Sequence, residues 1–298
     1  MSYHKQPFLI RLLIRWLVWP VEAAGLLLLS GLFRLLPVRM ASWLGGAAVR
    51  LLAPFSSWQR RAEQNLAHAM PELEADQRHA LIRKMWWQTG RTAGEFFHAS
   101  QLVRSGQVAI TGLHHLTENP GGSILVGGHF GNWEIMPEAV RQSGREVGII
   151  YRPLNNQLAN WIFQTRQNQR RTKTFIKGRE AALGMVATVT AGGVMLILAD
   201  QQLREGAEVP FFGHPAQTAV SHIKVALRRK SALHMARTRR LPDGRLSLDI
   251  SAPLDLPEGE EEEAVLALAT RINQIFESWI REAPEQWLWP HRRWGRLD

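Results

Sequence analysis

Apolar and polar residues follow different rhythms in successive parts of the chain. From about residue 55 to 105, apolar residues such as Ile82 and Met85 recur every three or four positions, which predicts helices. The stretch Pro71–Asp76 interrupts this pattern and predicts a turn between two of the helices. Later, Pro257 and an acidic run precede a sustained apolar stripe that ends near Trp279. Acidic residues suit a helix N-terminus, so a long helix is predicted there.

Between these helical segments the chain carries short runs rich in β-forming residues, at 108–111, 123–126, 147–151, 194–198 and 246–250. Helical stretches separate several of these runs. Strands that alternate with helices form parallel sheets covered by helices. The predicted fold class is therefore α/β, with a mostly parallel central sheet flanked by helices.

The N-terminal residues 8–36 are almost entirely apolar, but Pro20 and Glu22 interrupt them. Only 18 residues separate Arg15 from Arg34, whereas a spanning helix needs about 20 apolar residues. We therefore expect a membrane-anchoring helix that dips into one leaflet. A single-pass helix and a hydrophobic helix packed on the protein's own core are the alternatives. Residues 1–50 are predicted to form the anchor and residues 51–298 a single folded domain.

Composition narrows the classes of partner. The 298 residues include no cysteine, which excludes disulfides and thiolate chemistry. The net charge of +10 favours anionic lipid or an acidic protein as a partner. Nucleic acid is not expected, because the chain carries no nucleic-acid-binding motif. Twelve tryptophans against two tyrosines suit a protein at a membrane interface.

The strongest chemical signal is the stretch Ser123–Glu134, where an apolar run meets glycines, then His129, then Glu134. On an ideal helix these two side chains lie about 140° apart, so they do not share a helical face. They converge if His129 leaves a buried strand on a turn and Glu134 lies in the first turn of the next helix. Gly131 permits the sharp turn and Asn132 suits an N-cap. This arrangement predicts a general base oriented by a carboxylate, although an isolated His–Glu pair is more often structural.

Two further residues are expected at the same edge of the sheet. Asp200 follows the apolar run 194–199, so it should emerge near His129, unless it serves only as a turn former or helix cap. Arg152 follows the run 147–151, where its guanidinium would pair with Glu134 or receive a phosphate or thioester oxygen.

A basic stretch from Arg166 to Arg179 offers another cation for the site, with a solvated basic surface as the plainer interpretation. Val209–Gly213 predicts a β segment, followed by a turn and a helix that Thr218 caps. Neither the serine-hydrolase elbow Gly-x-Ser-x-Gly nor the zinc motif His-Glu-x-x-His occurs. A metal site from His129, Glu134 and a distant histidine has little support in the spacing, so no metal is expected.

The stretch His129–Glu134 resembles the signature of the lipid A biosynthesis acyltransferases, the lauroyl and myristoyl transferases of Gram-negative bacteria. Other segments resemble the same family in the same order, from about residue 60 to the C-terminus. They are Asn65-Leu66 with Pro71-Glu72, Gly90-Arg91-Thr92 with Glu95, Tyr151–Asn156, Asp200-Gln201, Val209–Gly213 with Ala216 and Thr218, Pro284–Trp289, and His291–Trp294.

This resemblance implies a glycerolipid-acyltransferase-like fold of the lysophospholipid acyltransferase superfamily. It makes Asp200 and Gln201 a site pair and Thr218 a site residue. It places Arg166 in an Arg-x-x-x-Gly motif whose glycine is missing here, so Arg179 is an alternative for that role.

The resemblance also implies an O-acyltransferase on the cytoplasmic face of the inner membrane. In that reading His129 takes the proton from a lipid hydroxyl, Glu134 holds the imidazole, and Arg152 stabilises the oxyanion or holds a sugar phosphate. The donor is an acyl-carrier-protein thioester, the acceptor is a lipid A precursor, and no cofactor is needed. Alternatives are another glycolipid or lysophospholipid acceptor, or a non-catalytic lipid-binding protein of the membrane surface.

Overall fold

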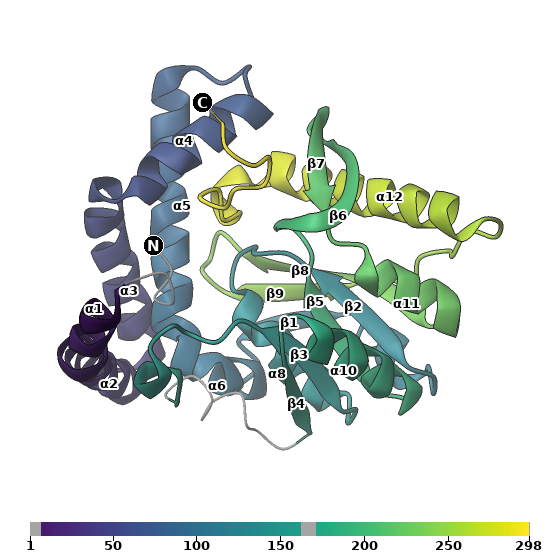
Figure 1. Ribbon diagram of the computed structural model, residues 1–298, viewed down its shortest axis with the longest axis horizontal. Coiled ribbons are helices and arrows are strands. Elements are labelled where there is room, and N and C mark those ends of the chain that lie inside the picture. Colours follow the sequence, from purple (N-terminus) through teal and green to yellow (C-terminus); the bar gives the residue numbers. More distant parts are fainter. Residues whose placement is uncertain (1–6, 162–170, 298) are drawn as a thin grey trace.

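The computed structural model describes residues 7–161 and 171–297. Within them, seven strands form one central sheet in the order β1-β9-β8-β2-β5-β3-β4, and two more form a hairpin, β6-β7 (Figure 1). The strands are β1 (Val108–Thr111), β2 (Ser123–Gly127), β3 (Val147–Tyr151), β4 (Thr172–Ile176), β5 (Val194–Leu198), β6 (Gln202–Phe211), β7 (His214–Thr218), β8 (Ala232–Arg240) and β9 (Leu246–Ile250).

The central sheet is mostly parallel, which confirms the predicted fold class. Strands β8, β2, β5, β3 and β4 run the same way, and β9 is antiparallel to β8 while parallel to β1. All five strands predicted from the central part of the sequence are present. Strands β4, β6, β7 and β8 were not predicted as they stand, because their polar and arginine-containing sequences hide the apolar pattern of a buried strand.

Helices cover both faces of the sheet (Figure 1). Alternate side chains of a strand point to opposite faces. Accordingly Ile124 and Val126 join the core beneath α10, α11 and α12, whereas Leu125 joins the core beneath α6 and α8. The main helices of the body are α4 (Ser57–Ala69), α5 (Ala75–Glu95), α6 (Ala99–Arg104), α8 (Met136–Gln142), α10 (Arg179–Thr190), α11 (Ser221–Arg229) and α12 (Glu261–Glu282).

The N-terminal part is also helical. It contains α1 (Phe8–Leu13), the π-helical turn η2 (Ile14–Val18), α2 (Trp19–Leu35), α3 (Val38–Leu52) and the short 3-10 helix η3 (Ala53–Phe55). Helix α3 packs on α5 at backbone distance. A Cβ on Gly90 would lie only 2.2 Å from the carbonyl oxygen of Gly45, so this approach requires glycine.

The hairpin corrects one local prediction. Thr218 is the last residue of β7, and the following helix, α11, begins only at Ser221. Thr218 therefore does not cap a helix. The turn between β6 and β7 is made by Phe212 and Gly213, which have φ angles of 53° and 75°. The antiparallel pairing continues across this turn, which is why the segment extends as a second strand.

Candidate active site

His129 and Asp200 meet at the carboxyl end of two neighbouring parallel strands. Gly127 at the end of β2 pairs with Leu198 at the end of β5. Each strand then runs two residues further, so His129 and Asp200 face one another beyond the sheet. The carboxyl ends of parallel strands are where α/β sheets place ligands. The structure thus confirms the predicted location of Asp200.

Asp200 holds the imidazole of His129 directly. Its Oδ1 lies 2.8 Å from Nδ1 of His129, and its Oδ2 accepts the His129 backbone N–H at 2.8 Å and the indole N–H of Trp287 at 2.8 Å. Burial alone would raise the pKa of this carboxyl, but the charge and hydrogen bonds of His129, together with Trp287, lower the pKa to about 2. Asp200 is therefore a carboxylate that only accepts, so Nδ1 of His129 carries a proton and, in the neutral imidazole, Nε2 is the nitrogen with the free lone pair.

Two side chains contact the ring from other directions. The side-chain nitrogen of Gln201 lies 3.3 Å from Nδ1 and 3.2 Å from Nε2 of His129. The ring of Trp133 meets the imidazole at a centroid distance of 5.1 Å and an interplanar angle of 63°. These contacts leave the imidazole 17% exposed, on the side of a cavity.

Glu134 lies where the sequence placed it, in the short 3-10 helix η5 (Trp133–Ile135) that follows the turn. Its backbone N–H donates to the side-chain oxygen of Asn132 at 3.1 Å, which confirms the predicted N-cap. Its Oε1 accepts the indole N–H of Trp133 at 3.1 Å. The sequence predicted that Glu134 orients the imidazole. In the structure Asp200 makes the hydrogen bond at Nδ1 of His129, and the role of Glu134 in the reaction stays a prediction.

A cavity of about 650 Å³ opens beside the imidazole and has a polar and an apolar part. The polar part is lined by His129, Glu134, Arg141, Arg152, Lys177 and Gln201. The apolar lining comes from α10, β3 and β5 and consists of Ile149, Ala181, Ala182, Met185, Ile197 and Leu198. A site of this kind accepts an extended apolar chain whose reacting end is polar.

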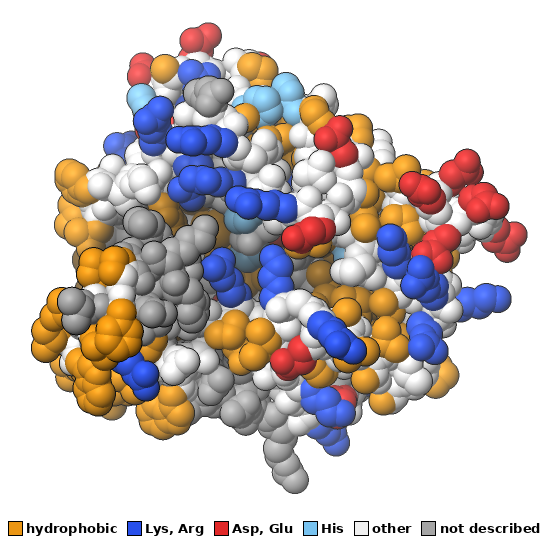
Figure 2. Space-filling view, in the orientation of Figure 1, with side chains coloured by type: hydrophobic (Ala, Val, Ile, Leu, Met, Phe, Trp, Pro, Cys, Tyr) orange, Lys and Arg blue, Asp and Glu red, His pale blue; other side chains and the backbone are white. Residues whose placement is uncertain are grey.

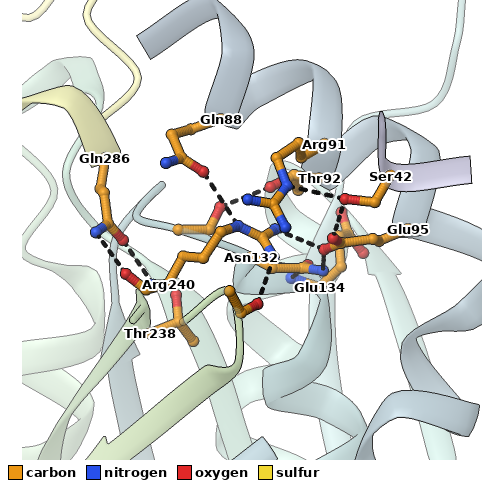
Figure 3. Close-up of polar contacts among 12 residues, drawn as sticks. Ser42, Gln88, Arg91, Thr92, Glu95, Asn132, Glu134, Thr238, Arg240 and Gln286 are labelled. Carbon is orange, nitrogen blue, oxygen red and sulfur yellow. Dashed lines mark hydrogen bonds and ion pairs between the residues drawn. The ribbon is translucent and has the colours of Figure 1, made fainter. Parts of the chain in front are cut away.

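A network of buried polar side chains, centred on Glu95 and Arg240, supports the turn that carries His129 (Figure 3). Glu95, at the end of α5, accepts hydrogen bonds from Ser42 Oγ at 2.6 Å, Asn132 Nδ2 at 2.8 Å and Arg240 at 2.7 Å. The side chains of Glu95 and Arg240 are each only 3% exposed. Buried charges are costly unless paired and hydrogen-bonded, as they are here. Gln88 and Ser42 add contacts to the two arginines, Arg240 and Arg91.

The same network and the C-terminal segment satisfy the backbone of the turn itself. The carbonyl oxygen of His129 accepts the Leu288 N–H at 3.1 Å, that of Phe130 accepts Thr238 Oγ1, and that of Gly131 accepts Thr92 Oγ1 at 2.7 Å. Gly131 has a φ of 47°, which glycine adopts without strain. Elements from four distant parts of the sequence therefore fix the position of His129.

The other residues that the sequence predicted for the site differ in their position relative to the cavity. Arg152 is exposed at the cavity, and Arg179 begins α10 beyond the cavity residues Lys177 and Gly178. Arg166 lies outside the described residues. Thr218 is buried away from the cavity lining, where its Oγ1 accepts a hydrogen bond from Arg293 at 2.8 Å.

Sequence analysis gave no chemical role to Glu95, Arg240 or Trp287. Glu95 and Trp287 stand in segments that carry the family resemblance, but only the fold brings them to the site. Across residues 7–161 and 171–297, no three His, Asp or Glu side chains gather as metal ligands do.

The fold and the site define a class: an α/β enzyme in which a histidine, paired with a buried aspartate, lines a cavity of mixed polar and apolar character. The family model of the bacterial lipid A biosynthesis acyltransferases matches residues 4–296, so the chain belongs to this family and is an acyltransferase. Among its relatives, the lipid A biosynthesis palmitoleoyltransferase of Escherichia coli K12 is 29% identical over 296 residues, covering 93% of this chain and 90% of the relative.

Two further relatives bear related names. The lipid A biosynthesis lauroyltransferase of Escherichia coli K12 is 29% identical over 277 residues, which is 86% of this chain and 84% of the relative. A lipid A biosynthesis acyltransferase of Haemophilus influenzae is 26% identical over 243 residues, covering 78% of this chain and 76% of the relative.

Proposed function

We propose that this protein transfers a fatty acyl chain from an acyl-carrier-protein thioester to a hydroxyl of a lipid A precursor, at the cytoplasmic face of the inner membrane. The observation that carries the proposal is the 2.8 Å contact between His129 Nδ1 and buried Asp200, beside a cavity that His129 lines together with apolar side chains. Family membership supports a lipid acceptor.

His129 acts as the general base. Asp200 keeps the proton on Nδ1, so Nε2 removes the proton from the acceptor hydroxyl as its oxygen attacks the thioester carbonyl. The tetrahedral intermediate collapses and expels the carrier thiolate, which takes the proton back from the imidazolium. The products are the acyl ester and the free carrier thiol, so no covalent enzyme intermediate is required.

Two kinds of charged group assist this reaction. The imidazolium that forms is stabilised by the Asp200 carboxylate and by Glu134, which lines the same cavity. Arg152 and Lys177 lie at the polar part of the cavity, where they stabilise the developing oxyanion or hold a substrate phosphate. The backbone N–H of Lys177 donates to the carbonyl oxygen of Tyr151 at 3.1 Å, which brings the two cations to one rim.

The apolar part of the cavity accounts for the acyl chain. Ala181, Met185 and Ile197 are apolar side chains that line the same cavity as His129. Apolar surface removed from water there favours an alkyl chain by about 0.8 kcal/mol per buried CH₂ group. The thioester carbonyl is then held at the polar end, within reach of His129.

A direct assay tests this function. Purified enzyme is given acyl-carrier-protein thioester and a lipid A precursor with free 3-hydroxyacyl chains, and the product is weighed by mass spectrometry. We expect one added acyl group with the wild type and a loss of about 10²–10⁴-fold with His129→Ala. Parallel reactions with a lysophospholipid show whether the acceptor assignment is correct. Preference for the lysophospholipid would contradict the proposal.

A further inference from the structure

Helix α2 belongs to an apolar stretch, Ile14–Leu35, that is long enough to cross a bilayer. In the structure, however, α2 is attached to the body at both ends. Near its start, Asn156 donates to the carbonyl oxygen of Trp19 at 2.9 Å and to Glu22 at 3.1 Å. Near its end, the ring of His98 contacts the carbonyl oxygen of Phe33 at 2.7 Å. A helix held in this way lies along the body and does not project from it.

Helix α2 has one face buried against the body and one face exposed. Trp19, Ala23 and Ser30 follow a helical spacing and are buried against the body. The rest of the helix presents large apolar side chains to the outside, and among them Val21 is 74%, Leu28 78% and Leu35 88% exposed. Such a helix has one face for the protein and one face for an apolar environment.

The exposed apolar surface continues past α2. Helix α3 buries its small residues against α5 and turns larger ones outward, and η3 and the start of α4 continue the surface. Its members beyond α2 are Met40, Trp43, Leu44, Leu51, Leu52, Phe55 and Trp58. Helices α1, α2 and α3 lie along the same flank of the molecule, at the left of Figure 1, and apolar side chains gather along this flank in Figure 2. We call this set of residues, together with the outer face of α1 and α2, the flank surface.

We propose that the flank surface is a single membrane-binding face that sinks into one leaflet, and that α2 lies in the plane of the bilayer without crossing it. This inference rests on the membrane location in the proposed function and specifies its geometry. The occupant is lipid because exposed Arg34, Arg39 and Arg50 border the apolar residues. Arginine and tryptophan around an apolar face are typical of helices at the headgroup level.

A short exposed segment connects the active-site cavity with α2. Tyr151 and Arg152 line the cavity, and the chain then continues through exposed Leu154, Leu158 and Trp161. Asn156, in the middle of this segment, is the residue that binds α2. A protein lying on this face therefore brings the cavity entrance close to the bilayer, so an acceptor lipid reaches His129 without leaving the membrane.

The decisive test is the side of the membrane from which introduced cysteines react. The sequence contains no cysteine of its own, so only the introduced ones are labelled. Single cysteines replace Arg15, Arg39 and, as a reference on the body, Glu262, all of them exposed. Intact spheroplasts and inverted vesicles are treated with a membrane-impermeant maleimide. The in-plane arrangement predicts that all three cysteines react from the same side. A spanning α2 predicts that Arg15→Cys reacts from the side opposite to the other two, which would overturn the inference.

A second experiment tests the part of the flank surface beyond α2. Leu51→Ser with Phe55→Ser is compared with Leu183→Ser with Leu266→Ser, two exposed apolar residues elsewhere on the body. In flotation with vesicles that contain anionic phospholipid, the first pair should weaken binding at least about tenfold and the control pair should not. Unchanged binding, or a loss of oligomer mass in detergent instead, would identify a contact between copies of the chain and refute a lipid occupant.

These outcomes are independent of the proposed chemistry. Both experiments read location and vesicle binding, which require no acyl transfer. Opposite sidedness with intact acyl transfer would disprove the in-plane helix alone. Correct sidedness without acyl transfer to a lipid A precursor would disprove the proposed function alone.

Discussion

The Oδ1 atom of Asp200 lies 2.8 Å from Nδ1 of His129, although the two residues are 71 positions apart in the sequence. The pair is produced by the register of two parallel strands, not by a local motif. Because the aspartate is held ionised, it decides which ring nitrogen carries the proton. The reactivity of His129 therefore depends on β5 as much as on its own turn.

The first prediction concerns Asp200. Asp200→Asn keeps the size of the side chain but can donate to Nδ1, which would place the proton on the wrong ring nitrogen. We expect kcat to fall about 10²–10⁴-fold. Trp287→Phe removes the indole hydrogen bond to Oδ2, and some buried volume, but leaves the contact of Asp200 with Nδ1; as a control it should show a much smaller loss. Activity of Asp200→Asn above about a tenth of wild type would exclude the tautomer role.

The second prediction concerns Glu134. If its negative charge stabilises the imidazolium, Glu134→Gln should lower kcat and shift the acidic limb of the pH–rate profile of kcat/KM, where a general base loses its proton, to lower pH. Glu134→Asp keeps the charge and should retain more activity. A profile identical to wild type for Glu134→Gln would assign this residue to packing with Trp133 instead.

The third prediction concerns the network behind the turn. The Glu95 carboxylate can only accept, so Asn132 must turn its amide nitrogen toward Glu95 and its oxygen toward the Glu134 N–H. Asn132→Asp places two carboxylates together and should lower kcat with little change in KM. Adding Glu95→Gln restores a donor–acceptor pair at this contact but removes the carboxylate that Arg240 binds. We therefore expect the double variant to recover only part, about tenfold, of a kcat loss that is typically 10²-fold for misplaced groups.

A merely structural role for this pair predicts a different pattern. In that case the double variant would be no more active than the worse single variant, and melting temperature would fall in step with kcat. Circular dichroism of each variant at the assay temperature separates folding from positioning.

The fourth prediction concerns the donor. Lys177 and Arg179 are exposed beside the cavity, and acyl carrier proteins are acidic. Because Lys177 also lines the cavity, only the charge of Arg179 is reversed; this should lower kcat/KM for the protein-borne donor more than for a small thioester analogue, and the wild-type value should fall with salt. Reversal of Lys224 and Arg229, which are exposed on α11, is the control. Equal losses for both donors in detergent without anionic lipid would contradict carrier docking.

The fifth prediction concerns stability and pH. His222 is buried, neither ring nitrogen has a hydrogen-bond partner among the described residues, and burial lowers its pKa to about 4. The unfolded chain binds a proton on this residue near pH 6.5, while the native state stays neutral down to about pH 4. The free energy of unfolding should therefore fall as the pH drops from 6.5 to 4, by up to about 1.4 kcal/mol per pH unit for this group.

His222→Leu should flatten this dependence and be neutral or stabilising at pH 7, because an apolar side chain replaces unpaired polar atoms. Urea unfolding at several pH values measures it. Burial also lowers the pKa of His291 to about 4. His291 therefore contributes equally to the pH dependence of the free energy of unfolding in the wild type and in His222→Leu. A slope unchanged by His222→Leu would show that the imidazole is solvated.

The sequence by itself determined the features that local patterns encode. Apolar runs predicted β2, which precedes His129, and β5, which precedes Asp200, because a buried parallel strand is apolar on both faces. Glycine and asparagine predicted the turn and the N-cap, since those conformations depend on neighbouring residues. The family motifs predicted the acyltransferase class. The position of Glu134 after the turn was correct for the same local reason.

Tertiary structure alone decided which groups meet. The order of strands in the sheet placed β5 beside β2, and this register, which no spacing in the sequence records, made Asp200 the partner of His129. The contacts of Glu95 with Asn132 and of Asn156 with α2 are long-range in the same way. A polar side chain carries no mark of its distant partner, because the energy of pairing exists only once burial has removed both groups from water.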